Sequence, residues 1–297
     1  MTSRMSPFEL ALSEARSLLF VPANRPERFI KALGSGADAV VLDLEDSVPQ
    51  SAKQIARDSI ASAWIALQAA GLPLVIRINA LDSPSGRDDL DWFQALGAMT
   101  SAVALIVPKA ESRLDLDRLA RRLPGVVLLP IIESAAGYAA LIDIAGATGV
   151  LRLVVGHIDF MADTGLQCSA DEPELAPLRF AVAMATRLRQ LAPAVDGATV
   201  DIDDEGRLHA DTRRAMRFGF GAKLCIHPRQ VAIVNASIGP STEELAWARR
   251  VIAADESAGG AAVQLDGRMV DAPVVLQARR MLARERTPAR AGRTIGA

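Results

Sequence analysis

Short runs of continuously apolar residues recur along the chain and are separated by segments with helical character. Their composition is Val, Ile, Leu and Ala, without the alternation of apolar and polar residues that marks a strand open to water on one face. A strand that is apolar on both faces is typical of a parallel sheet covered by helices. These runs are 17–23, 38–44, 73–78, 102–108, 126–132, 151–156, 194–200 and 222–226.

The segments between these runs have the composition and length of helices. We predict helices at 26–35, 51–70, 87–98, 111–122, 135–147, 173–192 and 207–218. Regular alternation of eight strands with helices favours an α/β fold of the (β/α)₈ TIM-barrel type, with an open doubly wound sheet as the alternative. The chain has 297 residues, and a barrel of about 250 residues commonly forms one domain. We therefore expect a barrel domain over 14–240.

The pattern changes after the eighth strand. Gly239-Pro240-Ser241 ends the last barrel helix, and Thr242 is predicted to cap a helix that runs to about 256. A short helix is predicted at 274–284. We expect 241–285 to be a C-terminal cap and oligomerisation segment, and 286–297, which is small and basic, to be a disordered tail.

Charge and hydropathy exclude several classes of partner. The formal net charge is −2, which provides no general attraction to nucleic acid or to an anionic membrane. No apolar run approaches the ~18 residues of a membrane span, and the first residues lack the apolar segment of a secretory signal. We expect a cytoplasmic protein that acts on a small molecule.

Polar residues stand at the end of almost every predicted strand. In a barrel these carboxyl ends meet at one rim, which is where barrel enzymes place their active sites. The sequence therefore predicts an active site at this rim. In chain order the residues are Asp43, Glu45, Asp46, Arg77, Asn79, Lys109, Glu133, His157, Asp159, Asp196 and His227.

Glu133 and Asp159 follow the fifth and sixth predicted strands. Two carboxylates at one rim repel each other unless a cation neutralises them. Mg²⁺ uses one or two carboxylates and keeps water in its other positions. The alternative is that either acid forms a structural ion pair with Arg77 or Lys109, and the spacing leaves both interpretations open.

Arg77 is flanked by apolar residues, so we expect its guanidinium to point into the barrel mouth. It could bind a carboxylate or stabilise a developing oxyanion there. It could equally neutralise Asp43 or Glu45. Lys53 and Lys109 are predicted to be structural partners of that acidic cluster.

The other basic residues and histidines near the strand ends each allow two interpretations. Arg25, Arg28 and Lys31 follow the first strand and could hold phosphates, or could form an ordinary solvated helix face. His157 and His227 could be simple hydrogen-bonding groups at strand ends. No two histidines are close in sequence, so a zinc site or a Ser-His-Asp triad is poorly supported.

Eight segments in order, each at a strand end or in the C-terminal segment, match one known family. Together they resemble the citrate lyase β-subunit-like branch of the HpcH/HpaI aldolase superfamily, which includes malyl-CoA, citramalyl-CoA and citryl-CoA lyases. The resemblance extends from about Arg16 to Arg284. The segments are RSLLFVPANRPERF, DAVVLDLEDSVP, VIRINALDSPSGRDDL, LIVPKAES, IIESAAG, VVGHIDFMADTG, GAKLCIHPRQV and LDGRMVDAP.

The resemblance implies a homo-oligomer (trimer or hexamer), Mg²⁺ on Glu133 and Asp159 with Mn²⁺ as a substitute, and coenzyme A as part of the substrate. The residues that it assigns to the coenzyme A moiety are Phe20, Arg28, Lys31, Ile226 and His227.

The resemblance also implies catalytic roles. Arg77 matches an arginine that contacts the acyl portion, and Asp271 matches an acid supplied by a neighbouring subunit. From the residues alone, Asp271 is a helix N-cap before Pro273. Glu45 is a third candidate, and with Asp43 we assign it to positioning. His157 departs from the family pattern, in which the corresponding residue is often small or acidic.

The predicted function is Mg²⁺-dependent cleavage or formation of a carbon–carbon bond in a carboxylated 3-hydroxyacyl-CoA thioester, to acetyl-CoA or a related acyl-CoA and an oxo acid. One alternative is a citrate lyase β-type subunit that acts on an acyl-carrier-protein thioester within a complex. Another is an aldolase for free 2-oxo acids that needs no coenzyme A. A third is a non-catalytic subunit that keeps the barrel.

Overall fold

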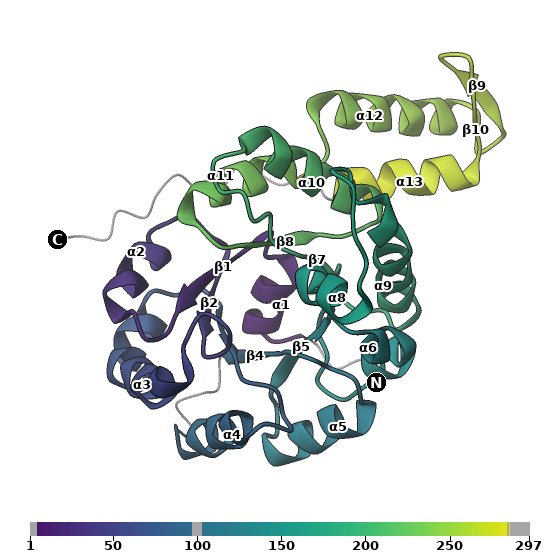
Figure 1. Ribbon diagram of the computed structural model, residues 1–297. Coiled ribbons are helices and arrows are strands. Elements are labelled where there is room, and N and C mark those ends of the chain that lie inside the picture. The colour runs from purple at the N-terminus through teal and green to yellow at the C-terminus, as the bar shows by residue number, and fades with distance from the viewer. Residues whose placement is uncertain (1–4, 97–102, 284, 286–297) are drawn as a thin grey trace. The chain divides into compact units, whose positions relative to one another are not determined.

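The computed structural model describes residues 5–96, 103–283 and 285, and its strands form the predicted closed parallel barrel (Figure 1). Each strand pairs in parallel with the next, and the eighth pairs with the first. The (β/α)₈ prediction is confirmed. The strands are β1 Ser17–Pro22, β2 Ala39–Asp43, β3 Leu74–Arg77, β4 Val103–Val107, β5 Val127–Ile132, β6 Val154–Val155, β7 Val195–Asp196 and β8 Ala222–Cys225.

Helices surround the barrel in a ring (Figure 1). They are α2 Phe29–Leu33, α3 Lys53–Ala69, α4 Pro84–Leu96, α5 Arg113–Arg122, α6 Ala135–Ala139, α7 Leu141–Ala145, α8 His157–Thr164, α9 Ala176–Leu188, α10 Glu205–Arg217 and α11 Pro228–Ser237. Short 3₁₀ turns lie at Pro26–Arg28, Gln50–Ala52 and Pro173–Leu175.

The sixth and seventh strands are shorter than predicted. Before β6, Leu151 still donates its N–H to Leu128 O, but this stretch forms no continuous ladder. After β7, the Gly197 carbonyl accepts from the side-chain ammonium of Lys223, a residue of the neighbouring strand β8. At Gly197 a side-chain group thus takes the place of a ladder partner. Helix α8 follows β6 directly and had not been predicted.

Helix α1 Pro7–Glu14 precedes the barrel and was not predicted. It lies across the middle of the ring of strands in Figure 1. Its Leu12 is fully buried with the residues of the barrel interior. The fully buried Arg152 donates to Leu12 O and Ala15 O, both at 2.8 Å, and so ties the end of this helix to the barrel.

The core has two layers, because side chains alternate between the two faces of each strand. Leu18, Val41 and Val75 belong to the cluster inside the barrel. Their neighbours in sequence pack against the helices. The same alternation, continued to the carboxyl ends, turns Asp43 and Arg77 inward at the top of the barrel.

The chain divides into two compact units, Met1–Ile238 and Gly239–Ala297. The second contains α12 Thr242–Ser257, the hairpin β9 Val263–Leu265 and β10 Arg268–Val270, and α13 Ala272–Ala283. Val251, Val270 and Val275 are among the buried residues of its own small core. The predicted tail, 286–297, lies outside the described residues.

Two details of the second unit differ from the prediction. Ser241, and not Thr242, caps α12, and its side chain forms a capping box with Glu244. The hairpin lies in a stretch for which no structure was predicted. Asp266 and Gly267 form its turn with φ of 51° and 77°, as Asp-Gly does in tight hairpins.

Candidate active site

A cavity of about 330 Å³ lies at the carboxyl ends of the barrel strands. Side chains that follow or end several different strands line it. Seven of its lining residues were named from the sequence, Phe20 and Ile226 through the resemblance: Phe20, Asp46, Arg77, Glu133, His157, Asp159 and Ile226. His157, Asp46 and the backbone around Gly156 and Gly197 complete its polar side.

Arg77 contacts Asp43 and Glu45, the two acids that the sequence analysis named as its possible partners. Its Nε and Nη2 donate to the two carboxylate oxygens of Asp43 at 2.6 and 2.7 Å. Its Nη1 lies 2.8 Å from Glu45 Oε2. The guanidinium also stacks over the Phe20 ring, 4.8 Å from the ring centre. A cation held on three sides is a rigid one, and its remaining N–H groups are available to a bound substrate.

The acids around Arg77 differ in their protonation. Burial alone would raise the pKa of Asp43, but the hydrogen bonds from Arg77 hold it below its usual value. Burial raises the pKa of Glu45 to about 8; Arg77 opposes this shift, and the nearby Asp46 and Glu133 add to it. Glu45 Oε2 is within ion-pair distance of Arg77 but is not directed for a hydrogen bond, so it is a buried oxygen without a hydrogen-bond partner.

Glu133 is 4% exposed and its Oε1 accepts from the Lys109 backbone N–H at 2.7 Å. Burial raises its pKa to about 7; the Lys109 N–H lowers it, and the carboxylate of Asp159 raises it further. In the described part of the chain neither Glu133 nor Asp159 forms an ion pair, so the alternative of a structural salt bridge has no support.

Gly156 leaves the space that Glu133 occupies. A Cβ at this glycine would lie 2.4 Å from Glu133 Oε2 and 2.7 Å from its Cβ. The backbone at the end of β6 therefore packs directly against the carboxylate. In the sequence this glycine follows Val154 and Val155 at the end of an apolar run, and it was not identified there as part of the site.

These residues suit a divalent cation. The carboxyl groups of Glu133 and Asp159 line one cavity. Burial and the neighbouring Asp159 raise the pKa of Glu133 to about 7, and a bound cation would favour the charged form of both acids. Among the described residues there is no cluster of three or more acidic, His or Cys side chains that could hold a metal. A site of two carboxylates with water in the other positions fits the preference of Mg²⁺.

The two lysines differ in their roles. Lys53 is buried, and its ammonium donates to the carbonyls of Leu44 and Glu45, both at 2.7 Å, so it supports the backbone of the acidic cluster as predicted. Lys109 contributes its backbone N–H to Glu133 instead, and its side chain is exposed. The prediction that its side chain pairs with the cluster is therefore wrong.

Three residues assigned to coenzyme A do not line the cavity. Arg28 and Lys31 are exposed, in the 3₁₀ turn Pro26–Arg28 and in α2. His227 caps α11, where its Nδ1 accepts from the Arg229 N–H at 3.2 Å. The interpretation of His227 as a strand-end hydrogen-bonding group describes this contact.

Asp196 was expected at the rim but lies on the outer face of the barrel, because the preceding Val195 takes the inner position. Its carboxylate accepts from Arg179 Nε at 3.0 Å and lies 3.8 Å from Lys223 Nζ. Burial alone would raise its pKa, but Lys223 and Arg179 hold it below the usual value. Asp196 is therefore a structural anion of the helix-facing layer.

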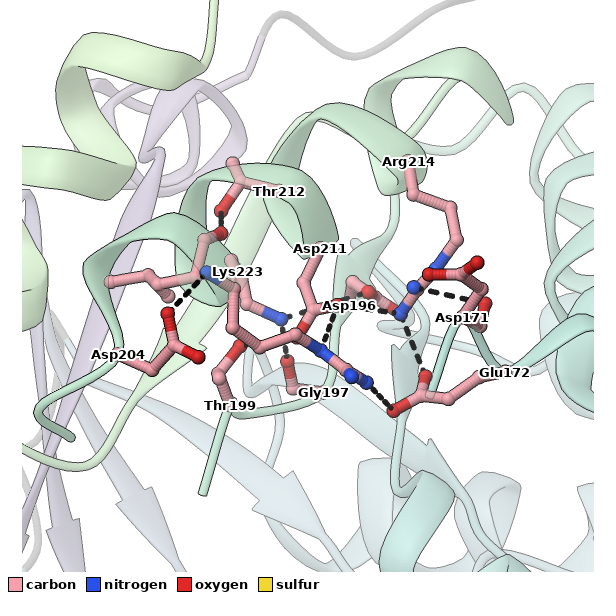
Figure 2. A network of polar contacts seen from close by, with 12 residues as sticks. Asp171, Glu172, Asp196, Gly197, Thr199, Asp204, Asp211, Thr212, Arg214 and Lys223 are labelled. Carbon is pink, nitrogen blue, oxygen red and sulfur yellow. Dashed lines mark hydrogen bonds and ion pairs between the residues drawn. The ribbon is translucent and has the colours of Figure 1, made fainter. Parts of the chain in front are cut away.

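Figure 2 shows the polar network around this carboxylate, between β7, β8 and helices α9 and α10. The Lys223 ammonium also donates to Gly197 O at 2.5 Å, and Gly197 lines the cavity on the other side. Glu172 pairs with Arg179 and with Arg214. The network therefore fixes the end of β7 behind the cavity wall.

Asp271 lies in the second unit, directly before α13. Its Oδ1 accepts from the Val274 N–H at 3.4 Å and its carbonyl accepts from Val275. The N-cap interpretation made from the residues alone describes this contact.

Comparison with known proteins agrees with this architecture. The family model described as HpcH/HpaI aldolase/citrate lyase matches residues 16–228. A citrate lyase subunit beta-like protein of Mycobacterium tuberculosis is 36% identical over 272 residues, which cover 90% of this chain and 94% of the relative. A (3S)-malyl-CoA thioesterase of Cereibacter sphaeroides is 31% identical over 272 residues, 91% of this chain and 94% of that protein.

A solved structure agrees as well. The M. tuberculosis protein CitE in complex with magnesium, acetoacetate and coenzyme A superposes with a TM-score of 0.78 at 34% identity, over 92% of this chain and 98% of that one. In the described part of the chain, every helix is too short or too polar to cross a membrane.

Proposed function

The chain belongs to the HpcH/HpaI aldolase/citrate lyase family and is a carbon–carbon lyase of that family, and from this premise we propose that it is Mg²⁺-dependent and acts on a carboxylated 3-hydroxyacyl-CoA thioester. It would release acetyl-CoA, or a related acyl-CoA, and an oxo acid, or join the two in the reverse direction. The observation that carries the proposal is the cavity on which Glu133, Asp159 and Arg77 meet.

Glu133 and Asp159 would hold the Mg²⁺, as two acidic side chains of the cavity that form no ion pair with a described residue. When bound, Mg²⁺ polarises the hydroxyl and carboxylate oxygens of the substrate, which lowers the pKa of that hydroxyl. Magnesium is present in the CitE structures with acetoacetate and coenzyme A and with pyruvate.

Arg77 would stabilise the charge that develops on the thioester. In the cleavage the hydroxyl proton of the substrate passes to water and the hydroxyl becomes the carbonyl of the oxo acid. The electron pair of the broken carbon–carbon bond then forms the double bond between the α-carbon and the thioester carbonyl carbon, so the thioester oxygen becomes an enolate oxygen. The guanidinium is held by Asp43, Glu45 and the Phe20 ring. A donor fixed in advance pays no reorganisation cost when that charge forms.

A proton must then reach the enolate carbon, and we assign its delivery to Asp271 of a neighbouring subunit. In the condensation direction the same carboxylate would remove a proton from the thioester methyl group. We predict that Asp271→Asn lowers kcat at least 1,000-fold, roughly the contribution of a general acid or base, with unchanged Mg²⁺ and thioester affinity by calorimetry.

The N-cap contact of Asp271 provides the control for that variant. Asn is as good an N-cap as Asp, so Asp271→Asn keeps α13 capped and isolates the chemical role. Full turnover in this variant would remove Asp271 from the mechanism.

The proposal also covers the oligomeric state and the residues that bind coenzyme A. A residue supplied by a neighbour requires a homo-oligomer, and we propose a trimer or a hexamer that operates in the cytoplasm. Arg28 and Lys31 are exposed cations that follow β1, the strand of Phe20. They are suited to the phosphates of coenzyme A, and we assign Ile226 and His227, which follow β8, to the same moiety.

The direct test uses the purified chain with malyl-, citramalyl- and citryl-CoA and Mg²⁺, and measures acetyl-CoA and oxo acid by chromatography. We expect release of both products, loss of activity on chelation, and loss of Mg²⁺ binding in Glu133→Gln and Asp159→Asn. Asp143→Asn, an exposed acid of α7, is the matched control.

Other outcomes would identify the alternatives. Turnover of an acyl-carrier-protein thioester but of no coenzyme A thioester would indicate a citrate lyase β-type subunit, as in the relative from Leuconostoc mesenteroides. Free coenzyme A released without an oxo acid would indicate a thioesterase, the activity in the name of the Cereibacter relatives. Cleavage of a free 2-oxo acid substrate would indicate an aldolase that needs no coenzyme A.

A further inference from the structure

His157 is the first residue of α8, is 6% exposed, and lines the cavity together with Arg77, Glu133 and Asp159. The mechanism above gives it no task. Its ring lies against Gly197, since a Cβ built on that glycine would fall 2.1 Å from His157 Nδ1. The imidazole therefore occupies space that the absence of a side chain at Gly197 leaves open.

Hydrogen-bond donors are scarce in this cavity. Among the described residues that line it, Arg77 and His157 are the only ones with a nitrogen donor in the side chain. Arg77 already holds Asp43 through two N–H groups and lies against Glu45 with a third nitrogen. No hydrogen bond from the His157 ring to a described residue is present, so its N–H is a further uncommitted donor beside the remaining N–H groups of Arg77.

The position of His157 in the barrel indicates which half of a substrate it faces. It follows β6, two residues before Asp159, and β6 pairs with β5, which carries Glu133. Strand β7 separates it from β8, which precedes Ile226, and β7 and β8 together separate it from β1 and Phe20. Its place directly after β6 puts it nearest in the chain to Asp159 and next to the strand of Glu133, so we assign it to the part of the rim where the two carboxylates lie.

We propose that His157 is a substrate-contacting residue that donates a hydrogen bond to a carboxylate oxygen of the oxo-acid half and thereby sets specificity for that half. The proposal rests on the proposed function, because it takes the oxo acid to lie beside Glu133 and Asp159. The ring provides a donor where the other lining groups of this side are acids or apolar residues. A carboxylate against those acids gains most from such a donor.

The buried network of Figure 2 fixes the surface on which the ring lies. Lys223 Nζ donates to Gly197 O at 2.5 Å, and the preceding Asp196 is held by Arg179 Nε at 3.0 Å. Gly197 is therefore anchored on both sides of its Cα. Because the backbone at Gly197 is anchored, the imidazole that packs against it keeps its N–H in one position. A donor in a fixed position can discriminate between substrates.

The test measures the two substrates of the condensation reaction separately, with acetyl-CoA and glyoxylate, pyruvate or oxaloacetate. For His157→Ala we expect the KM of the preferred oxo acid to rise about 10- to 100-fold, as for loss of one hydrogen bond to a charged group. The KM of acetyl-CoA should change less than about twofold, because uniform damage to the site would raise both.

Two further variants separate hydrogen bonding from folding. His157→Gln keeps an N–H donor and should recover part of the lost affinity. His209→Ala removes a histidine of α10 that contacts Ser237, remote from the cavity lining, and should leave both KM values unchanged.

A double-mutant cycle tests the contact with Gly197. Gly197→Ala places a methyl group against the ring and should raise the oxo-acid KM in the wild type. The same substitution should cost much less in the His157→Ala background, where the clash with the ring is gone.

The proposal is overturned if His157→Ala leaves the oxo-acid KM unchanged, if it raises both KM values alike, or if the two substitutions are additive. Calorimetric titration of each variant with pyruvate and with oxaloacetate in Mg²⁺ gives the same comparison without turnover. If the wild type binds oxo acids but cleaves no thioester, the proposed function is refuted. The binding test still decides the role of His157: equal oxo-acid affinity of wild type and His157→Ala would refute that role.

Discussion

Replacing Arg77 with Met should destabilise the barrel by removing the cation of a buried ion pair. Asp43 is 1% exposed and Arg77 is 14% exposed at the side chain, so solvent screens their interaction little. Removing one partner of a buried pair leaves the other charge uncompensated, which costs about 3–5 kcal/mol. Glu45, which also lies against Arg77, adds little charge, because burial raises its pKa to about 8 even with Arg77 present.

Removing the second partner should restore part of that stability. Asp43→Asn in the Arg77→Met background abolishes the unpaired charge, and Asn can still accept the Glu45 N–H that Asp43 Oδ1 accepts at 2.9 Å. We therefore expect a coupling free energy of roughly 2–3 kcal/mol between the two sites.

Urea unfolding followed by circular dichroism measures these differences. With an m value near 3 kcal/mol/M, a loss of about 4 kcal/mol moves the midpoint by roughly 1.3 M. Arg77→Lys, which keeps a charge but loses the two-point contact, should fall between wild type and Arg77→Met. If Arg77→Met unfolds at the wild-type midpoint, or if the double variant is no more stable than the single one, then the pair is not what holds this rim together.

Three further outcomes are expected. Gly156→Ala should weaken Mg²⁺ binding at least tenfold in calorimetry. The added Cβ would lie 2.4 Å from Glu133 Oε2, and overpacking of about 1–3 kcal/mol would displace the carboxylate. The control Gly206→Ala, whose Cβ would have its nearest contact at 3.5 Å, should leave the affinity unchanged. The pKa of Asp196 is depressed in the folded state, so its stabilisation is complete above its ordinary value of 3.8 and is lost as the pH falls below it. The melting temperature of Asp196→Asn should therefore be lower than that of wild type at pH 7, and the gap should narrow as the pH falls below 3.8; a constant gap would contradict the assignment. Ser241→Ala should cost about 1 kcal/mol through loss of the α12 cap, while Thr242→Ala should cost less, as urea unfolding of both variants would show.

The barrel was predictable from local pattern. Strands covered on both faces need apolar residues at every position, and β2, β4 and β5 are buried throughout as the sequence predicted. The site at the carboxyl ends was predictable for the same reason, since alternation along β2 and β3 turns Asp43 and Arg77 inward once the apolar core is complete. Glu133 and Asp159 could be singled out because each is a carboxylate close behind an apolar strand: Glu133 directly follows β5, and Asp159 lies in the first turn of α8 after β6.

Other features follow from contacts between residues far apart in the chain. Nothing in the sequence near Asp196 shows that it faces Arg179 and Lys223, because a two-residue strand leaves too little alternation to decide the face. Lys109 was taken for a side-chain partner, although its backbone N–H makes the contact, and only the path of the chain determines which of its groups meets Glu133.

The sequence by itself determined the order of strands and helices, the aliphatic core and the acids and arginine of the rim, since each depends on residue type and on where the continuously apolar runs begin and end. Tertiary structure alone decided that Arg77 is shared by Asp43 and Glu45, that Gly156 packs against Glu133 and that Gly197 makes room for His157. Such contacts depend on the register in which the barrel closes, because a shift by one residue would turn every one of these side chains to the opposite face.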